Sequence, residues 1–277
     1  MLIAQTSAGI ARRTADGYEL LDTAWSLYEL IRDECLDSLS EVGVLDVVAF
    51  DSVTTLPPVH RPGKVCIVGL NYTDHAEEIG VEAPSTPRFS WAAGSSVIGS
   101  FDDIVLPENA PDEVDYEGEL AVVIGSHAKG LDRAQAWSAV AGVCVANDVS
   151  ARDVQRGRGA HGVGANIGVA KSFDTFTPLG PALLTADELA PGTALQITTT
   201  IDGELRQSST TANMLFGIDV LVSTISRYAT LEPGDVILTG TPAGVGLTTG
   251  RFLRPGQLVE VEIERIGVLR NRVVSAP

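Results

Sequence analysis

The chain has 277 residues, of which 44% are hydrophobic and 20% charged; 36 acidic against 19 basic residues give a net charge of −17. This composition excludes a largely disordered chain, and the length allows one or two domains with a sizeable core. The strong negative charge, without a lysine- or arginine-rich run, argues against nucleic acid as a partner. No apolar run reaches the roughly 18 residues of a membrane span and no signal peptide is evident, so we expect a cytoplasmic protein without a membrane partner.

Residues 1–60 form a small N-terminal α/β domain in our prediction. The predicted helix is based on apolar residues that recur at helical spacing: Leu27, Leu30, Ile31 and Leu36. The proline-rich segment 56–62 is typical of an extended linker, and no motif that carries chemistry precedes it. The predicted elements are strands within 2–12 and at 45–50 and a helix at 26–38.

Residues 61–277 form the second predicted domain, which holds the chemistry. Its apolar or alternating runs end at glycine, proline and aspartate turns, a pattern that predicts strands. The predicted strands are 64–70, 117–124, 142–147, 196–201, 236–239 and 259–264, and the predicted helices are 73–80, 132–140 and 213–229. Because strands and helices do not alternate regularly, we exclude a Rossmann fold and predict a mostly β (α+β) protein.

Carboxylates gather around two of these strands. Glu117 and Glu119 are two residues apart, so their side chains share one face of a strand. Asp148 follows the end of the strand at 142–147. Three carboxylates form an all-oxygen set that suits Mg²⁺, Mn²⁺ or Ca²⁺. The alternative is that the two glutamates face solvent and that Asp148 is a turn residue.

A second polar motif lies in the predicted helix at 73–80. His75 and Glu78 are at i and i+3 and therefore share a face. A carboxylate beside a histidine can orient the imidazole ring and increase its basicity, which produces a general base. The alternative is an exposed ion pair on a helix.

Six motifs follow one another along the chain. They are N-Y-x-x-H-x-x-E at 71–78, E-x-E at 117–119, N-D-V-S-A-R-D-x-Q at 147–155, A-K-S-F-D-T-F-T-P-L-G-P at 170–181, D-G-E-L-R-Q at 202–207 and L-x-P-G-D-V-I-L-T-G-T-P-A-G-V-G at 231–246. Taken together, the motifs resemble the fumarylacetoacetate hydrolase family, in the branch of acylpyruvate hydrolases and 2-hydroxyhepta-2,4-diene-1,7-dioate isomerases. The resemblance runs from about 63 to 270. It implies a mixed β-sandwich roll with a small N-terminal domain, and a homodimer.

The resemblance also implies a role for each matching residue. It assigns Mg²⁺, or alternatively Mn²⁺, to the three carboxylates Glu117, Glu119 and Asp148. The implied catalytic residues are His75, Glu78 and Lys171. The candidate substrate-binding residues are Tyr72 in the first motif, Arg152 and Gln155 in the third, and Thr241 in the last.

We expect a metal-dependent hydrolase that cleaves a C–C bond of a 1,3-dicarbonyl compound, with a keto acid or diketone as substrate. The alternatives are a 2-hydroxy-dienedioate isomerase, an oxaloacetate-type decarboxylase and, in a different class, a non-catalytic metal-binding scaffold. Two departures from the family pattern predict an aromatic pocket and a bulkier substrate. Trp91 stands where relatives carry a lysine in an F-x-K pattern, and the loop at 156–169, which adds His161, is longer than in compact relatives.

Overall fold

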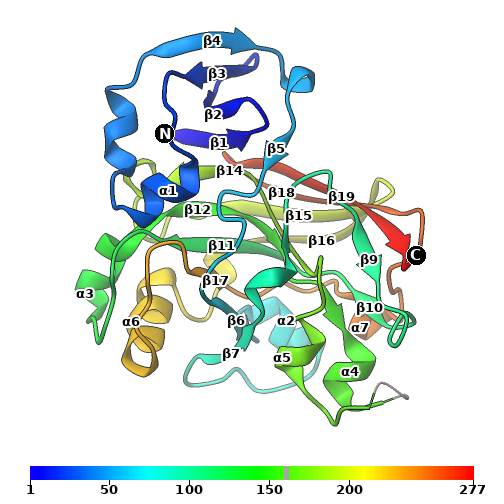
Figure 1. The fold of residues 1–277 in the computed structure, drawn as a ribbon. Helices are drawn as coiled ribbons and strands as arrows, with labels where there is room; N and C mark the ends of the chain where they lie inside the picture. Colours follow the sequence, from blue (N-terminus) through cyan, green and yellow to red (C-terminus); the bar gives the residue numbers. More distant parts are fainter. Residues whose placement is uncertain (159–161) are drawn as a thin grey trace.

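The computed structural model describes residues 1–158 and 162–277, so His161 lies outside the described residues. Its main feature is a large mixed sheet in the order β4-β3-β2-β1-β14-β12-β11-β17-β6-β7, with β5 beside β1 and β8 beside β14 (Figure 1). The predicted mostly β fold is confirmed. The strands are β1 (Leu2–Thr6), β2 (Gly9–Arg13), β3 (Tyr18–Leu21), β4 (Val44–Val48), β5 (Thr55–Leu56), β6 (Val65–Gly69), β7 (Arg88–Ala92), β8 (Val97–Ile98), β11 (Gly118–Ile124), β12 (Val140–Asn147), β14 (Thr177–Thr185) and β17 (Val236–Leu238).

A second sheet of five strands packs against the first. Leu120 and Val122 of β11 share one buried hydrophobic cluster with Val261 and Leu269 of this second sheet. The two sheets therefore enclose the main core between them, as in a sandwich. The order is β16-β15-β18-β19-β9, with β9 (Ile104–Leu106), β15 (Gln196–Ile201), β16 (Glu204–Thr210), β18 (Leu258–Ile263) and β19 (Gly267–Ser275); the two-stranded pair β10 (Val114–Asp115) and β13 (Ser150–Ala151) lies outside both sheets.

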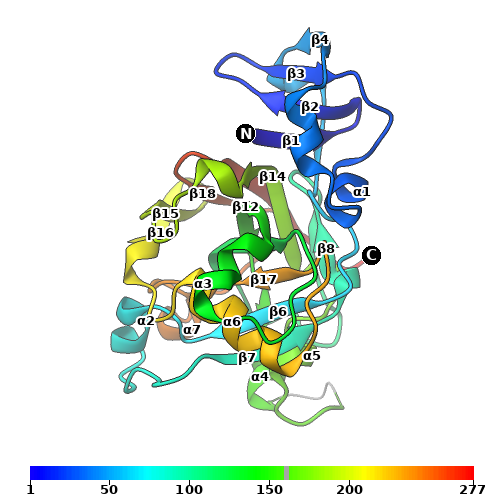
Figure 2. The same ribbon diagram turned by 90° about the vertical axis from the view of Figure 1, so that its left-hand side faces the viewer.

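The N-terminal strands stand apart from the rest of the chain in Figure 2 but belong to the same large sheet. β1 pairs antiparallel with β14, with Ile3 opposite Leu183. The first helix, α1 (Leu27–Arg32), is shorter than predicted. The chain leaves the helical conformation at Glu34, which has a φ of 56°, and continues as a 3₁₀ turn. The division at residue 60 remains a prediction, since hydrogen bonds of one sheet cross it.

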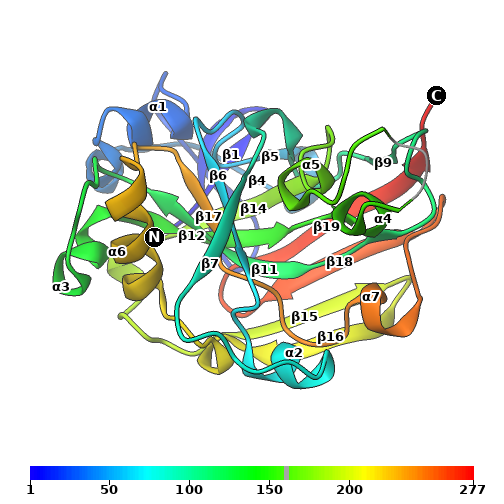
Figure 3. The same cartoon turned by 90° about the horizontal axis from the view of Figure 1, so that it is seen from below.

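Short helices surround one end of the sheets. In Figure 3, α2, α4, α5 and α7 all lie to one side of the β6–β7 pair, while α3 and α6 lie to the other. Among the described residues, no helix is long and apolar enough to cross a membrane. These helices are α2 (Thr73–Glu78), α3 (Arg133–Ala136), α4 (Arg152–Arg156), α5 (Ile167–Ala170), α6 (Ile218–Tyr228) and α7 (Gly246–Thr249).

Candidate active site

Three carboxylates meet where β11 begins and β12 ends. Glu117 directly precedes β11, Glu119 lies within it, and Asp148 directly follows β12. The two strands pair antiparallel, and the amide of Asp148 donates to the carbonyl of Glu117 at 2.8 Å, which fixes the register of the three residues. One carboxylate oxygen from each lies within 4.8 Å of the others, and all three residues are buried.

Two oxygens of this triad have no partner. The Oε1 of Glu119 and the Oδ1 of Asp148 are inaccessible to solvent and accept no hydrogen bond from any described residue. A buried charged oxygen without a partner is costly, and a cation that coordinates it removes the cost. Because three carboxylates within coordinating reach are ligands that hard divalent cations prefer, the triad fits a divalent metal ion. The predicted solvent-facing alternative is wrong.

The three carboxyl groups of the triad differ in how readily they ionise. Burial opposes ionisation of Glu117, but Arg152 and Lys171 outweigh it and lower the pKa of Glu117 to about 2. Burial, with repulsion from Asp148 and Glu117, raises the pKa of Glu119 well above its usual range. Burial also raises the pKa of Asp148 to about 6, although Lys171 partly opposes the shift. The chain's own cations therefore neutralise only part of the site.

Lys171 is one of these cations, and it bridges two members of the triad. Its Nζ donates to Oε2 of Glu117 at 2.8 Å and to Oδ2 of Asp148 at 2.5 Å. The side chain comes from the residue that ends α5 and is buried. Burial alone would lower the pKa of Lys171, but the two carboxylates offset it and raise that pKa above its usual value. The lysine is thus held as a cation at the site.

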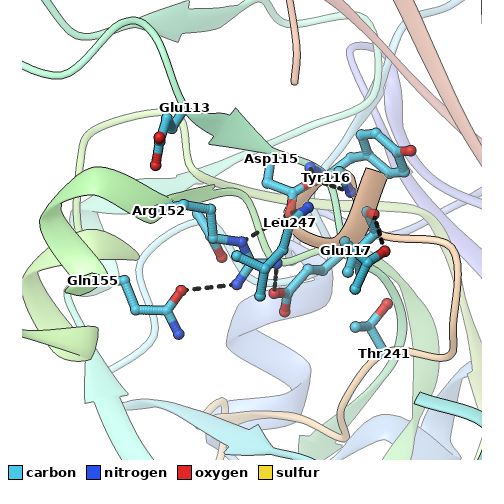
Figure 4. Close-up of polar contacts among 12 residues, drawn as sticks. Glu113, Asp115, Tyr116, Glu117, Arg152, Gln155, Thr241 and Leu247 are labelled. Atoms are coloured by element: carbon cyan, nitrogen blue, oxygen red, sulfur yellow. Dashed lines mark hydrogen bonds and ion pairs between the residues drawn. The ribbon is translucent and has the colours of Figure 1, made fainter. Parts of the chain in front are cut away.

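Arg152 is the second cation. Its guanidinium forms an ion pair with Glu117, and its Nε donates to Oδ2 of Asp115 at 2.8 Å (Figure 4). One turn of α4 later, Gln155 accepts from Nη1 of Arg152 at 2.9 Å. Gln155 and Arg152 both line the cavity described below, as does Thr241, whose hydroxyl donates to the carbonyl of Gly118. These predicted substrate-binding residues are therefore brought together.

Sequence reasoning missed Asp115, which organises this side of the site. Asp115 is fully buried and accepts from the amides of Gly246 and Leu247 at 2.7 and 2.8 Å while it holds Arg152. It thereby ties the start of α7 to α4. The only sequence signal is its place beside the E-x-E motif, since its partners come from distant parts of the chain.

Gln207 was also missed. Its Nε2 donates to the hydroxyl of Thr241 at 2.8 Å, and its Oε1 accepts from the amide of Gly118 at 2.9 Å. The side chain therefore joins β16 to the start of β11, between the two glutamates of the triad. Gly118 has to be glycine, because a Cβ there would lie 2.2 Å from the hydroxyl oxygen of Thr199.

The predicted histidine–glutamate pair is present on α2. The Nδ1 of His75 lies 3.0 Å from Oε2 of Glu78. The other oxygen of Glu78 accepts from the amide of Gly244 at 3.0 Å and from the hydroxyl of Thr248 at 2.7 Å. An ionised carboxylate only accepts, so Nδ1 of His75 is the donor and its Nε2 is left to take up a proton. Because His75 is buried, an exposed helical ion pair is excluded.

A cavity of about 660 Å³ joins these groups. Glu117, Asp148 and Lys171 line it, and so does His75. Its apolar wall includes Val68, Ile79, Ile167 and Leu247. The cavity therefore brings two carboxylates of the triad, two buried cations and a base onto one space large enough for a small organic ligand.

Two residues expected at the pocket do not line it. Tyr72 is fully buried and is not among the cavity-lining residues; its hydroxyl has no described hydrogen-bond partner. Trp91 does not line the cavity either; it packs edge-to-face against Phe89 at 5.9 Å between ring centroids. Phe89 itself lines the cavity, so the wall at β7 does carry an aromatic side chain, from Phe89 and not from Trp91.

The two-sheet fold with a buried acidic triad, a buried lysine and a histidine–glutamate pair around one cavity is the arrangement of an enzyme. The chain belongs to the fumarylacetoacetate hydrolase family, because residues 64–274 match the family described as "Fumarylacetoacetate (FAA) hydrolase C-terminal".

Similar proteins carry several activities in their names. The chain is 47% identical over 232 residues to "Oxaloacetate tautomerase FAHD2B, mitochondrial" of Bos taurus, covering 83% of this chain and 72% of that protein. Among solved structures, 5-carboxymethyl-2-hydroxymuconate delta-isomerase from Mycobacterium smegmatis is 32% identical with a TM-score of 0.81. Maleylpyruvate hydrolase from Sphingobium sp. SYK-6, in complex with manganese (II) ion and pyruvate, is 26% identical with a TM-score of 0.80. Both structural matches cover 100% of each chain.

Proposed function

We propose that this protein is a divalent-metal-dependent enzyme that interconverts the keto and enol forms of a small 2-oxo acid. The observation that carries the proposal is the cavity in which His75, held by Glu78, faces the same space as Glu117 and Asp148 of the carboxylate triad. A base beside a cation site is what the removal of a proton next to a carbonyl group requires.

The chain's own residues can perform the proton transfer. Nε2 of His75 would take the proton from the carbon next to the carbonyl, and the electron pair of that C–H bond would move onto the carbonyl oxygen. Return of the proton to this oxygen yields the enol. Lys171 and Arg152 place positive charge where the oxygen becomes negative. Mg²⁺ or Mn²⁺ held by the triad would supply further charge that stabilises this oxygen.

Hydrolysis of a C–C bond is the second candidate. The sequence alone favours it, because the histidine–glutamate pair can activate water. The same base can remove a proton from carbon, so its presence does not distinguish the two reactions. Similarity to a maleylpyruvate hydrolase supports hydrolysis at 26% identity, whereas similarity to oxaloacetate tautomerases at 44–47% supports tautomerisation more strongly. An oxaloacetate-type decarboxylase shares the same requirement for a cation.

The experiment starts from protein stripped with EDTA and reloaded with Mg²⁺ or Mn²⁺. Enol oxaloacetate and an acylpyruvate are supplied separately, and loss of enol absorbance, pyruvate release and CO₂ release are followed together. We expect loss of the oxaloacetate enol without pyruvate or CO₂ at early times, dependence on metal, and deuterium exchange at C3 of the keto acid in D₂O.

His75→Ala is the matched control, because it removes the base and leaves the triad intact. We expect the rate to fall by about 10²-fold or more, as for loss of a general base. Release of stoichiometric pyruvate from the acylpyruvate, without deuterium exchange at C3, would show that the reaction is hydrolysis and not tautomerisation. Full activity without metal, or in the His75→Ala variant, would refute the proposed site.

A further inference from the structure

Arg88 is a cation of the cavity that the mechanism above does not use. It is the first residue of β7, it is exposed, and it lines the same cavity as Lys171 and His75. It forms no ion pair with any described residue, whereas Lys171 and Arg152 are both held by carboxylates. Arg88 is thus available to an anion that enters the cavity.

The pairing of β6 with β7 explains why Arg88 reaches the cavity. Arg88 lies opposite Gly69, and Ser90 lies opposite Ile67; all four line the cavity. Side chains alternate along a strand, so Arg88 and Ser90 share one face of β7; Phe89, on the other face, also lines the cavity. Gly69 has no side chain to fill the space beside the arginine.

We propose that Arg88 is a specificity-determining residue that binds a second carboxylate, at the far end of a 2-oxo acid substrate. This inference rests on the proposed function and adds the substrate class, a 2-oxo dicarboxylate. The head of the substrate would lie at the triad beside Lys171. A cavity of about 660 Å³ leaves room for a tail beyond that head, and the guanidinium can bind a carboxylate through two parallel hydrogen bonds.

The rim of the cavity also carries a negative charge, Glu82. Glu82 repels a distal carboxylate, whereas Arg88 attracts it. The two residues therefore form a matched pair of surface variants with opposite expected effects.

The test compares Arg88→Gln, Arg88→Lys and Glu82→Gln with the wild type. The ligands are oxaloacetate and fumarylpyruvate, each beside its distal monoester, and oxalate, which has a head but no tail. Affinities are measured by calorimetric titration of the Mg²⁺-loaded protein, which requires no turnover, and KM is measured by loss of enol absorbance.

We expect Arg88→Gln to weaken binding of a dianion by about tenfold or more, as for the loss of a charge-assisted hydrogen-bonded pair, without a comparable change for its ester or for oxalate. Arg88→Lys should recover part of the affinity, and Glu82→Gln should strengthen it. Higher ionic strength should weaken dianion binding in the wild type more than in Arg88→Gln.

Equal losses of affinity for acid and ester in both pairs would overturn the role of Arg88. If Arg88→Gln loses affinity for the acids more than for the esters, and no ligand is turned over by the wild type, the carboxylate subsite would stand and the proposed function would be refuted. An unchanged affinity for every ligand in Arg88→Gln would also overturn the inference, because Arg88 would then contact none of them.

Discussion

The unequal neutralisation of the triad predicts that the metal-free protein loses stability as the pH rises from about 5 to about 8. Burial raises the pKa of Asp148 from 3.8 to about 6. A carboxyl group with a raised pKa binds its proton more tightly when folded, so its stabilising effect is complete below the unfolded-state pKa and is lost as the pH rises through the folded-state value. The raised pKa of Glu119 acts in the same direction. Glu117, with its lowered pKa, acts in the opposite direction but below this pH range.

For Asp148 alone, the whole shift corresponds to about 3 kcal/mol of unfolding free energy, lost mainly between the two pKa values; about half of it, roughly 1.4 kcal/mol, is lost between about pH 5 and about pH 8. For a chain of this size that is a fall in melting temperature of about 3 °C over this range. A divalent cation at a hundredfold excess over its Kd adds about 3 kcal/mol at the higher pH. It adds less at pH 5, because protons compete for the same oxygens.

The assay is thermal unfolding at several pH values from 5 to 8, in EDTA and with Mg²⁺ or Mn²⁺. Glu119→Gln is the control, since it removes one charge and keeps the shape; it should flatten the pH dependence and abolish most of the stabilisation by metal. A metal-free melting temperature that is constant or rises over this range, or full metal stabilisation of Glu119→Gln, would refute the reasoning.

Three further predictions follow from individual contacts. Glu78→Gln should lower kcat by about tenfold to hundredfold with little change in KM, because His75 loses its orienting acceptor; an unchanged kcat in steady-state kinetics would contradict this. Trp91→Lys should leave the preference between substrates unchanged, since Trp91 does not line the cavity; a shift in relative kcat/KM toward dicarboxylates would show that this position contributes. Gly118→Ala should destabilise the fold by about 2 kcal/mol or more through overpacking against Thr199, and an unaltered melting curve would rule out the clash.

The chemistry of the site could be predicted from the sequence because it depends on short spacings. Glu117 and Glu119 need only a strand to share a face, and His75 and Glu78 need only one helical turn. The helical turn is present in α2; Glu117 lies one residue before β11, and its carboxylate nevertheless meets that of Glu119. Asp115 and Gln207 could not be found in this way, because their partners lie 131 and 89 residues away in the chain.

The strand β14 shows what local patterns cannot reveal about the fold. Pro178 and Pro181 argue against a central strand, since proline cannot donate to a ladder. β14 nevertheless lies between β1 and β12 and is buried along its whole length. Its pairing with β12 shifts register between Val143 and Val145, so the ladder accommodates the prolines through an irregularity that only the assembled sheet defines.

The position of Trp91 relative to the cavity could not be predicted for the same reason, because it depends on strand pairing. Without a predicted strand at 88–92, no face could be assigned to the side chains there. Once β7 pairs with β6, Trp91 lies opposite Cys66 and Arg88 opposite Gly69. Arg88, three residues before the position where relatives carry a lysine, lines the cavity, whereas Trp91 does not.

The net charge of the inner site explains how an acidic protein could accept an acidic substrate. Four buried carboxylates, Asp115, Glu117, Glu119 and Asp148, face two buried cations, Arg152 and Lys171. In their ionised forms they leave an excess of two negative charges, which one divalent cation would balance. Binding of a 2-oxo acid should therefore depend on metal even before any reaction. Any preference for a second carboxylate must come from outside this balanced set, and Arg88 is the cation on the cavity wall that lies outside it.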